Sequence, residues 1–258
     1  GDVYKRQAIS MIGVSALGMM FFTSRPVGDA MATTIWGTSS SWTLTALPLF
    51  VWMGEILFRT KLSENLFEGL SPWMQKLPGG LIHVNVVGCA LFAAISGSSA
   101  ATVATVGKMS IPELRKRKYP EKILLGSLAG SGTLGLLIPP SIILIIYGVT
   151  VQESIAKLFI AGILPGIMIA AIFMLYVVFW SLLNKKVMPR SFENFSFFQK
   201  IKKSKQLLPV FILILAVIGS IYTGIATATE AASLGVVGAL VLAYFQKSLN
   251  LKSFKESL

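Results

Sequence analysis

Seven long stretches of the sequence carry no charged residue, and together they make up most of its 258 residues. A soluble domain could bury one or two such segments, but it could not cover itself with the few polar residues that remain. Charged residues make up 13% of the chain, against about 25% in ordinary soluble domains. The pattern predicts a membrane protein whose uncharged segments are 7–24, 30–54, 77–107, 123–152, 158–184, 206–229 and 231–246.

The net charge of +12 would favour nucleic acid as a partner if the protein were soluble. When the side of the membrane alternates at each predicted crossing, however, all 23 Lys and Arg residues except Arg25 and Lys157 fall on one side. An excess of Lys and Arg on one side of the membrane is typical of cytoplasmic loops. The net positive charge therefore indicates the orientation of the protein in the membrane. The sequence also lacks the interleaved aromatic and basic residues that are typical of proteins that bind single-stranded nucleic acid, so we do not expect nucleic-acid binding.

Residues 81–107 are flanked by basic residues at both ends, Lys76 before them and Lys108 after them. The chain must therefore enter and leave the membrane on the same side. Two full crossings would need about 40 residues, which is more than this segment offers. We predict a re-entrant helical hairpin whose tip, residues 96–101, lies near the middle of the membrane.

Residues 122–149 form one outward crossing with an interrupted centre. Several glycines and the pair Pro139-Pro140 occur there, and no continuous helix tolerates that combination. Residues 130–135 also match the G-x-G-x-x-G spelling of dinucleotide-binding turns, but such a turn needs a strand before it and a regular helix after it. We therefore expect an unwound membrane helix and no nucleotide site.

The hairpin tip and the unwound segment are the candidate site. Backbone groups freed by a broken helix must be buried in protein or line a wet cavity, so two interruptions at one depth are expected to face each other. Helix ends supply carbonyl groups for a cation, and helix starts and Ser hydroxyls supply donors for an anion. The alternative is that the small residues only permit tight helix packing.

Three segments match the S/T-x-x-E capping box that opens a helix: residues 110–113, 150–153 and 227–230. We expect the first to start a short cytoplasmic helix, the second to start an outer helix through residue 160, and the third to start the last crossing.

Three further polar residues have a structural interpretation. Glu55 lies within a crossing, where an ionisable group raises a functional hypothesis, but snorkelling or an i,i+4 pair with Arg59 is favoured. His83 and Cys89 lie on apolar faces, where packing is favoured. A single His and a single Cys also exclude a disulfide framework and a Cys/His zinc site.

Four ordered motifs resemble one known family. They are AAISGSSAATVATVG at 93–107, GTLGLLIPPSIILIIYG at 132–148, LFIAGILPG at 158–166 and TATEAA at 227–232. They closely resemble the large membrane subunit of tripartite ATP-independent periplasmic (TRAP) transporters, in unbroken order from about residue 44 to residue 258. One departure is Ala228, where the family usually has Pro.

The resemblance implies an all-α polytopic fold with two inverted repeats, each holding a hairpin and a broken helix. Residues 1–258 would be a single permease domain, incomplete at both ends, with the first repeat at about 44–184 and the start of the second at about 207–258. It also implies a Na⁺ site built from Ser96, Gly97, Ser98, Ser99, Gly132, Thr133, Ile138 and Pro139. Ser98, Ser99 and Ser141 would lie near the substrate carboxylate.

The resemblance further implies a function. Similar proteins are sodium-coupled importers of organic acids in the bacterial inner membrane, and they work with a small membrane subunit and a periplasmic binding protein. Na⁺ would be the coupling ion, with no other metal and no cofactor. The alternative is a dicarboxylate or anion carrier that works without a binding protein. An intramembrane enzyme is disfavoured because the spans hold no nucleophile and base pair.

Overall fold

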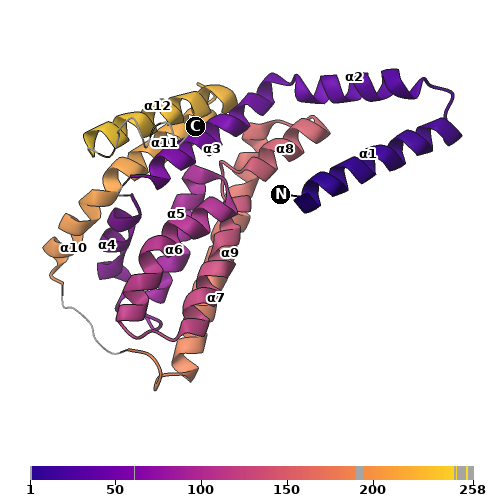
Figure 1. Cartoon of the computed structure of the whole chain (residues 1–258). Helices are drawn as coiled ribbons and strands as arrows, with labels where there is room; N and C mark the ends of the chain where they lie inside the picture. Colours follow the sequence, from indigo (N-terminus) through magenta and orange to yellow (C-terminus); the bar gives the residue numbers. More distant parts are fainter. Residues whose placement is uncertain (1, 61, 190–194, 247, 249–253, 255–258) are drawn as a thin grey trace. The chain divides into compact units, whose positions relative to one another are not determined.

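The computed structural model describes residues 2–60, 62–189, 195–246, 248 and 254. Every regular element in this part of the chain is helical, as predicted (Figure 1). The chain divides into two compact units, Gly1–Trp42 and Thr43–Leu258, which are described separately.

The N-terminal unit is a pair of apolar helices, α1 (Asp2–Phe22) and α2 (Val27–Ser39), joined by a short turn. Pro26 precedes α2, whose first turn carries Asp29, and an acidic residue there suits the positive end of the helix dipole. α2 buries none of its residues, and Phe22 of α1 is 88% exposed. The unit therefore presents apolar side chains on its surface, as lipid-facing helices do.

The centre of the second unit is the predicted hairpin. Its two arms are α5 (Ile82–Ser96) and α6 (Ser99–Lys116), which pack against each other. With 15 residues, α5 is only about 22 Å long, shorter than the roughly 30 Å hydrocarbon core. The backbone N–H of Leu81, before the hairpin, donates to the hydroxyl of Tyr119, after it, over 3.1 Å. The two ends of the hairpin therefore meet, as the basic flanks predicted.

The interrupted crossing follows the hairpin and breaks where the Gly and Pro residues predict. Neither of its helices is long enough to span a bilayer alone. After the break the chain turns back through one long helix, which runs beside the hairpin and the first half of the crossing (Figure 1). The elements are α7 (Glu121–Gly132), the 3₁₀ turn η2 (Thr133–Leu136), α8 (Ile142–Val151) and α9 (Ile155–Leu183).

The remaining helices complete the second unit. α12 packs along α3 and α11, and α10 packs against α4. Gly235 of α12 allows a close approach to Met53 of α3, because a Cβ at residue 235 would overlap the Met53 sulfur. These remaining helices are α3 (Ala46–Phe58), α4 (Leu62–Met74), α10 (Phe197–Ser204), α11 (Leu208–Tyr222) and α12 (Ala228–Phe245), and the 3₁₀ turns are η1 (Trp42–Thr45) and η3 (Lys205–Leu207).

Three helical segments of the described residues are long and apolar enough to cross a membrane on their own: Ile155–Leu183, Phe197–Tyr222 and Ala228–Phe245. Large apolar side chains cover the outside of the first, where Leu164 is 77% exposed and Phe179 is 65% exposed. Contact between such a surface and water would be unfavourable, so lipid surrounds it. The chain is an all-α membrane protein.

Two of the three expected capping boxes are wrong. Residues 110–113 start no helix, because α6 runs through Pro112 to Lys116, and Glu113 instead pairs with Arg117 over 2.9 Å. Residues 110–113 lie inside a helix that already began at the hairpin tip. The preceding turns of α6, rather than the motif, therefore determine the backbone conformation there.

The second motif fails for a similar reason. Thr150 belongs to α8 and donates to the carbonyl of Ile146, Gln152 ends α8 in a left-handed conformation, and Ser154 caps α9. The third motif is confirmed. The Thr227 backbone N–H donates to Glu230 Oε2 over 2.8 Å, and the Glu230 N–H donates to Thr227 Oγ1 over 3.3 Å.

The structural interpretations of the isolated polar residues are also confirmed. Arg59 donates to Glu55 Oε1 over 2.8 Å, the i,i+4 pair that was favoured. His83 is buried and its Nε2 lies 2.8 Å from the carbonyl oxygen of Pro78. Cys89 is buried as a free thiol. None of these residues lies at the break or at the hairpin tip.

Candidate functional site

The hairpin tip and the break in the crossing meet, as predicted. Gly97, between the two arms, has φ 58°, a left-handed conformation that glycine adopts without strain. Its carbonyl oxygen accepts a hydrogen bond from the backbone N–H of Ile142 over 3.4 Å. A Cβ on Gly97 would lie 2.6 Å from the carbonyl oxygen of Pro140. The backbones of the two interruptions are therefore in direct contact.

Gly135 makes the second contact; it lies in the predicted unwound segment but was not among the residues predicted to bind the ion or the substrate. A Cβ there would lie 2.8 Å from the Ser98 carbonyl carbon and 2.8 Å from the Ser99 nitrogen. No side chain larger than hydrogen fits without moving the tip. The close spacing of glycines from Gly130 to Gly135 was the available signal, but spacing alone did not show which glycine faces the hairpin.

Four helix ends converge at this junction. α5 and α7 end here, and their last carbonyl groups carry the negative ends of the helix dipoles. α6 and α8 begin here, at Ser99 and Ile142, and their first N–H groups carry the positive ends. The junction therefore offers carbonyl oxygens to a cation and N–H donors to an anion within one small region.

Hydroxyl groups at the hairpin tip differ in how far their hydrogen bonds are satisfied. Ser96 is buried, and its Oγ lies 2.9 Å from Oγ1 of Thr102, which was not among the predicted site residues. Ser98 caps α6 by accepting from the Ala101 N–H over 3.5 Å. The Ser99 Oγ is buried and has no hydrogen-bond partner among the described residues. A buried hydroxyl without a partner costs about 1–3 kcal/mol, so Ser99 is the tip residue most in need of a ligand.

Ser141 lies at the start of α8 but does not cap it. Its buried hydroxyl instead donates backward to the carbonyl oxygen of Leu136 over 2.5 Å. This hydrogen bond ties the unwound segment to itself. The first turn of α8 is consequently without a side-chain cap, and apart from the Ile142 N–H, which donates to Gly97, its N–H groups can receive an anionic group.

The other residues that were predicted to bind Na⁺ have three different surroundings. Gly132 faces the hairpin, where a Cβ would overlap the Val103 side chain. Pro139 is buried and Ile138 half-buried, both toward glycines of α9. The Thr133 side chain is exposed and donates to the carbonyl oxygen of Gly130 over 2.7 Å. Whether any of these residues binds an ion stays a prediction.

Gly54 of α3 approaches the junction from the other side. A Cβ at residue 54 would lie 2.9 Å from the Ser96 Cα atom. α3 therefore supports the end of α5 at backbone distance. The uncharged run at 30–54 gave no sign that this glycine would contact the hairpin.

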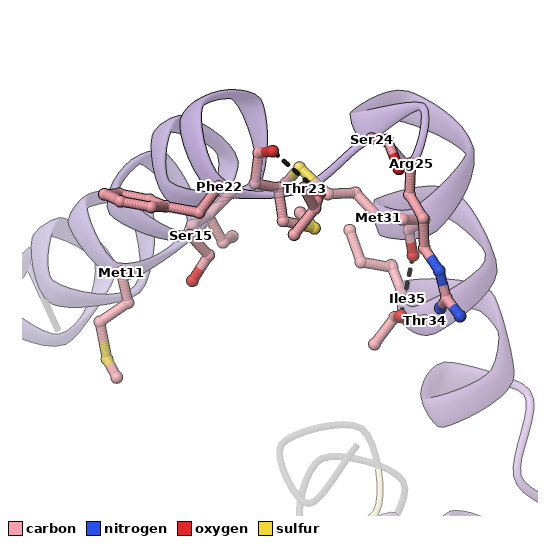
Figure 2. Close-up of a pocket in the computed structure, with 12 residues that line it drawn as sticks. Met11, Ser15, Phe22, Thr23, Ser24, Arg25, Met31, Thr34 and Ile35 are labelled. Atoms are coloured by element: carbon pink, nitrogen blue, oxygen red, sulfur yellow. Dashed lines mark hydrogen bonds between the residues drawn. The ribbon is translucent and has the colours of Figure 1, made fainter.

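A hollow lies within the N-terminal unit, between α1 and α2, with a volume of about 800 Å³ (Figure 2). Met11, Met31 and Ile35 line it, and Arg25 lies beside it. The hydroxyls of Thr23 and Thr34 donate to carbonyl groups of their own helices, at 2.9 Å and 2.8 Å. These groups are satisfied locally, so this hollow lacks the convergent polar groups of the junction.

The described residues contain no group of three or more His, Cys, Asp or Glu side chains that could hold a metal ion. The junction itself is formed by uncharged residues. The groups that these residues offer to a ligand are backbone dipoles and hydroxyls.

The fold and the junction define an all-α membrane protein built on a re-entrant hairpin and a broken helix, the architecture in which secondary transporters form their binding sites. Residues 5–258 match the family model of the tripartite ATP-independent periplasmic transporter, DctM component. The chain belongs to this family of membrane transport components, which are permeases and not enzymes.

Three relatives show the range of the family. The C4-dicarboxylate TRAP transporter large permease protein DctM of Pseudomonas aeruginosa is 34% identical over 91% of this chain and 54% of its own length. The isethionate TRAP transporter permease protein DctMQ of Oleidesulfovibrio alaskensis is 32% identical over 94% of this chain and 38% of its own. The sialic acid TRAP transporter permease protein SiaT of Haemophilus influenzae is 33% identical over 84% of this chain and 35% of its own length. The chain spans about half the length of the first relative, and less of the other two.

Proposed function

We propose that this chain forms the transport path of a sodium-coupled importer of organic acids. The observation that carries the proposal is the contact between Gly97 and Ile142, which brings two helix ends and two helix starts to one place. A cation and an anion can both be bound there by backbone groups alone. Coupling follows if occupation of the cation site stabilises the arrangement that binds the anion.

The proposed substrate class rests on the hydrogen-bond donors at the junction, which suit an anionic group. C4-dicarboxylates, isethionate and sialic acid, named for the three relatives, share an acidic group and differ elsewhere. The start of α8 and the hydroxyls of Ser98 and Ser99 would receive that acidic group in this protein. The rest of the substrate would contact other parts of the transporter, so we propose an organic acid and no particular one.

The proposed partners follow from the family. A tripartite periplasmic transporter implies three components, so we propose that this chain works with a small membrane subunit and a periplasmic binding protein. The corresponding location is the bacterial inner membrane, with the basic loops in the cytoplasm.

Ser99 provides the sharpest test of the ion site. Its hydroxyl has no partner among the described residues, so Ser99→Ala removes no internal hydrogen bond seen there and is expected to leave the thermal stability unchanged or slightly higher. If this hydroxyl binds Na⁺, the sodium concentration for half-maximal uptake rises severalfold. Uptake of a radiolabelled organic acid is measured in proteoliposomes that hold the assembled transporter containing this chain.

Ser220→Ala is the matched control. The Ser220 hydroxyl donates to the carbonyl oxygen of Val217 within α11, far along the chain from the junction. This variant is expected to keep the wild-type sodium dependence. The proposal would be contradicted if both Ser99→Ala and the double variant Ser98→Ala/Ser99→Ala kept the wild-type sodium dependence of uptake. The residues of the tip would then contribute to helix packing only.

A further inference from the structure

A groove with a volume of about 570 Å³ lies between α7 and α9, and Val86 of α5 also lines it. Gly126 and Lys122 line it from α7, and Phe173, Tyr176 and Trp180 line it from α9. Its walls are mostly apolar, and it lies on the outer surface of the helices rather than at the junction. It plays no part in the function proposed above.

Two glycines shape this groove. A Cβ on Gly126 would meet no atom within 4 Å, so the missing side chain leaves open space in the wall. One turn further along α7, a Cβ on Gly130 would lie 3.4 Å from the Phe173 ring. The two helices therefore close together toward the middle of the membrane, and the groove opens toward the end where Lys122 lies.

That open end is basic. Lys122 is exposed in the first turn of α7, and no ion pair or hydrogen bond of its side chain occurs among the described residues. The nearby carboxylates are engaged elsewhere, since Glu121 pairs with Arg115 and Glu113 pairs with Arg117. Within the described part of the chain, Lys122 is thus an unpaired positive charge at the mouth of an apolar groove.

The groove is short enough to lie within one leaflet of a bilayer. From Lys122 to Gly130 the helix rises about 12 Å, close to the roughly 15 Å hydrocarbon depth of one leaflet. Trp180 and Tyr176 are aromatic residues with a polar atom, the type that gathers at the level of lipid headgroups. Basic pockets between membrane helices on the positively charged side are typical sites for anionic headgroups.

We infer that this groove binds an anionic phospholipid, with an acyl chain between α7 and α9 and the headgroup phosphate on the Lys122 ammonium. Charge complementarity selects the anionic lipid over a zwitterionic one. The apolar walls select a lipid over free phosphate, which would leave the groove unfilled. The bound lipid would hold the first half of the broken helix against α9.

Trp180 reports on the groove directly. The assembled transporter is reconstituted in phosphatidylcholine nanodiscs, and phosphatidylglycerol with brominated acyl chains is added, because bromine quenches nearby indole fluorescence. The difference between wild type and Trp180→Phe isolates the Trp180 signal. We expect phosphatidylglycerol to quench that signal at severalfold lower mole fraction than brominated phosphatidylcholine does.

Three variants test the groove and two control for general effects. Lys122→Gln is expected to abolish the preference for phosphatidylglycerol, Lys122→Arg to retain it, and Gly126→Leu to reduce quenching by either lipid. Lys157→Gln, at the opposite end of α9, and Gly219→Leu, which also points into open space, are expected to behave as wild type.

Two results would overturn the inference. Equal quenching by both lipids would mean that the groove holds only the general lipid annulus. Absence of quenching by either lipid in wild type would mean that another part of the transporter covers the groove. Native mass spectrometry of the same samples, counting retained phosphatidylglycerol, separates these two results.

Discussion

Gly135 in the unwound segment packs on the Ser98 backbone so closely that a Cβ would lie 2.9 Å from the Ser98 carbonyl oxygen. Real Cβ atoms do not approach backbone atoms to this distance, so the contact exists only because residue 135 is glycine. It joins the hairpin to the broken helix at the point where four helix ends converge. Like the close contact of Gly97 with Pro140, this contact helps to set the shape of the junction.

Gly135→Ala is expected to displace the hairpin tip and to lower uptake strongly. Overpacking of a tight contact costs typically about 1–3 kcal/mol, so the protein should still fold, with reduced thermal stability. Stability and uptake are measured on the same proteoliposome samples. Gly219→Ala, where a Cβ meets no atom within 4 Å, is the control and should lose neither. Wild-type uptake by Gly135→Ala would show that this contact does not shape the transport path.

Replacing Pro139 and Pro140 together with Ala is expected to let helix form across the break. Each Pro disfavours a helix interior by about 3 kcal/mol relative to Ala, so the double variant should be as stable as wild type or more stable. Carbonyl groups that the break exposes would then be hydrogen-bonded within the helix, and uptake should fall. Ile143→Leu, at a position that is 49% exposed, should change neither property. A stable double variant that transports normally would remove the unwound segment from the site.

Thr227→Ala is expected to weaken the start of α12. The hydroxyl accepts from the Glu230 N–H, and loss of an N-cap of this type costs about 1 kcal/mol. Because α12 packs along α3, the loss should appear as a lower temperature of thermal unfolding for the whole second unit. Thr227→Ser keeps the hydroxyl and should retain most of the stability. An unchanged unfolding temperature in Thr227→Ala would mean that the cap contributes nothing beyond local order.

The hairpin topology predicts which surface positions face the same compartment. Single-cysteine variants at Lys76 and Lys116, in a Cys89→Ala background, should react with a membrane-impermeant maleimide only from the cytoplasm. A variant at Thr38 should react only from the opposite side. All three positions are exposed. Labelling of positions 76 and 116 from different sides would require a full crossing in place of the hairpin.

Several features of the fold were predictable because their signals act within a few residues. The uncharged runs indicated the membrane class, the basic flanks Lys76 and Lys108 indicated the hairpin, and Pro139-Pro140 indicated the break. Each depends on hydropathy, charge or a missing N–H group, all of which belong to single residues. The Thr227 cap was predictable for the same reason, since both partners lie in one turn.

Tertiary packing decided what those signals left open. The three capping-box motifs share the pattern S/T-x-x-E. Residues 110–113 lie inside a helix and residues 150–153 lie at the end of one, so among the three motifs only Thr227 and Glu230 form the box. Likewise, Thr133 was predicted to bind the ion, whereas Gly135 was not among the predicted binding residues. The rotation of η2 about its axis turns Gly135 toward Ser98 and leaves the Thr133 side chain exposed.

The sequence by itself therefore determined that the chain is a membrane protein, where the interrupted crossing breaks and which segments are basic. The tertiary structure decided which atoms of those segments meet. Contacts such as Gly97 with Ile142 join residues far apart in the chain, and they depend on how each helix is rotated against its neighbours. That rotation results from the packing of all the surrounding side chains at once, and no local pattern specifies it.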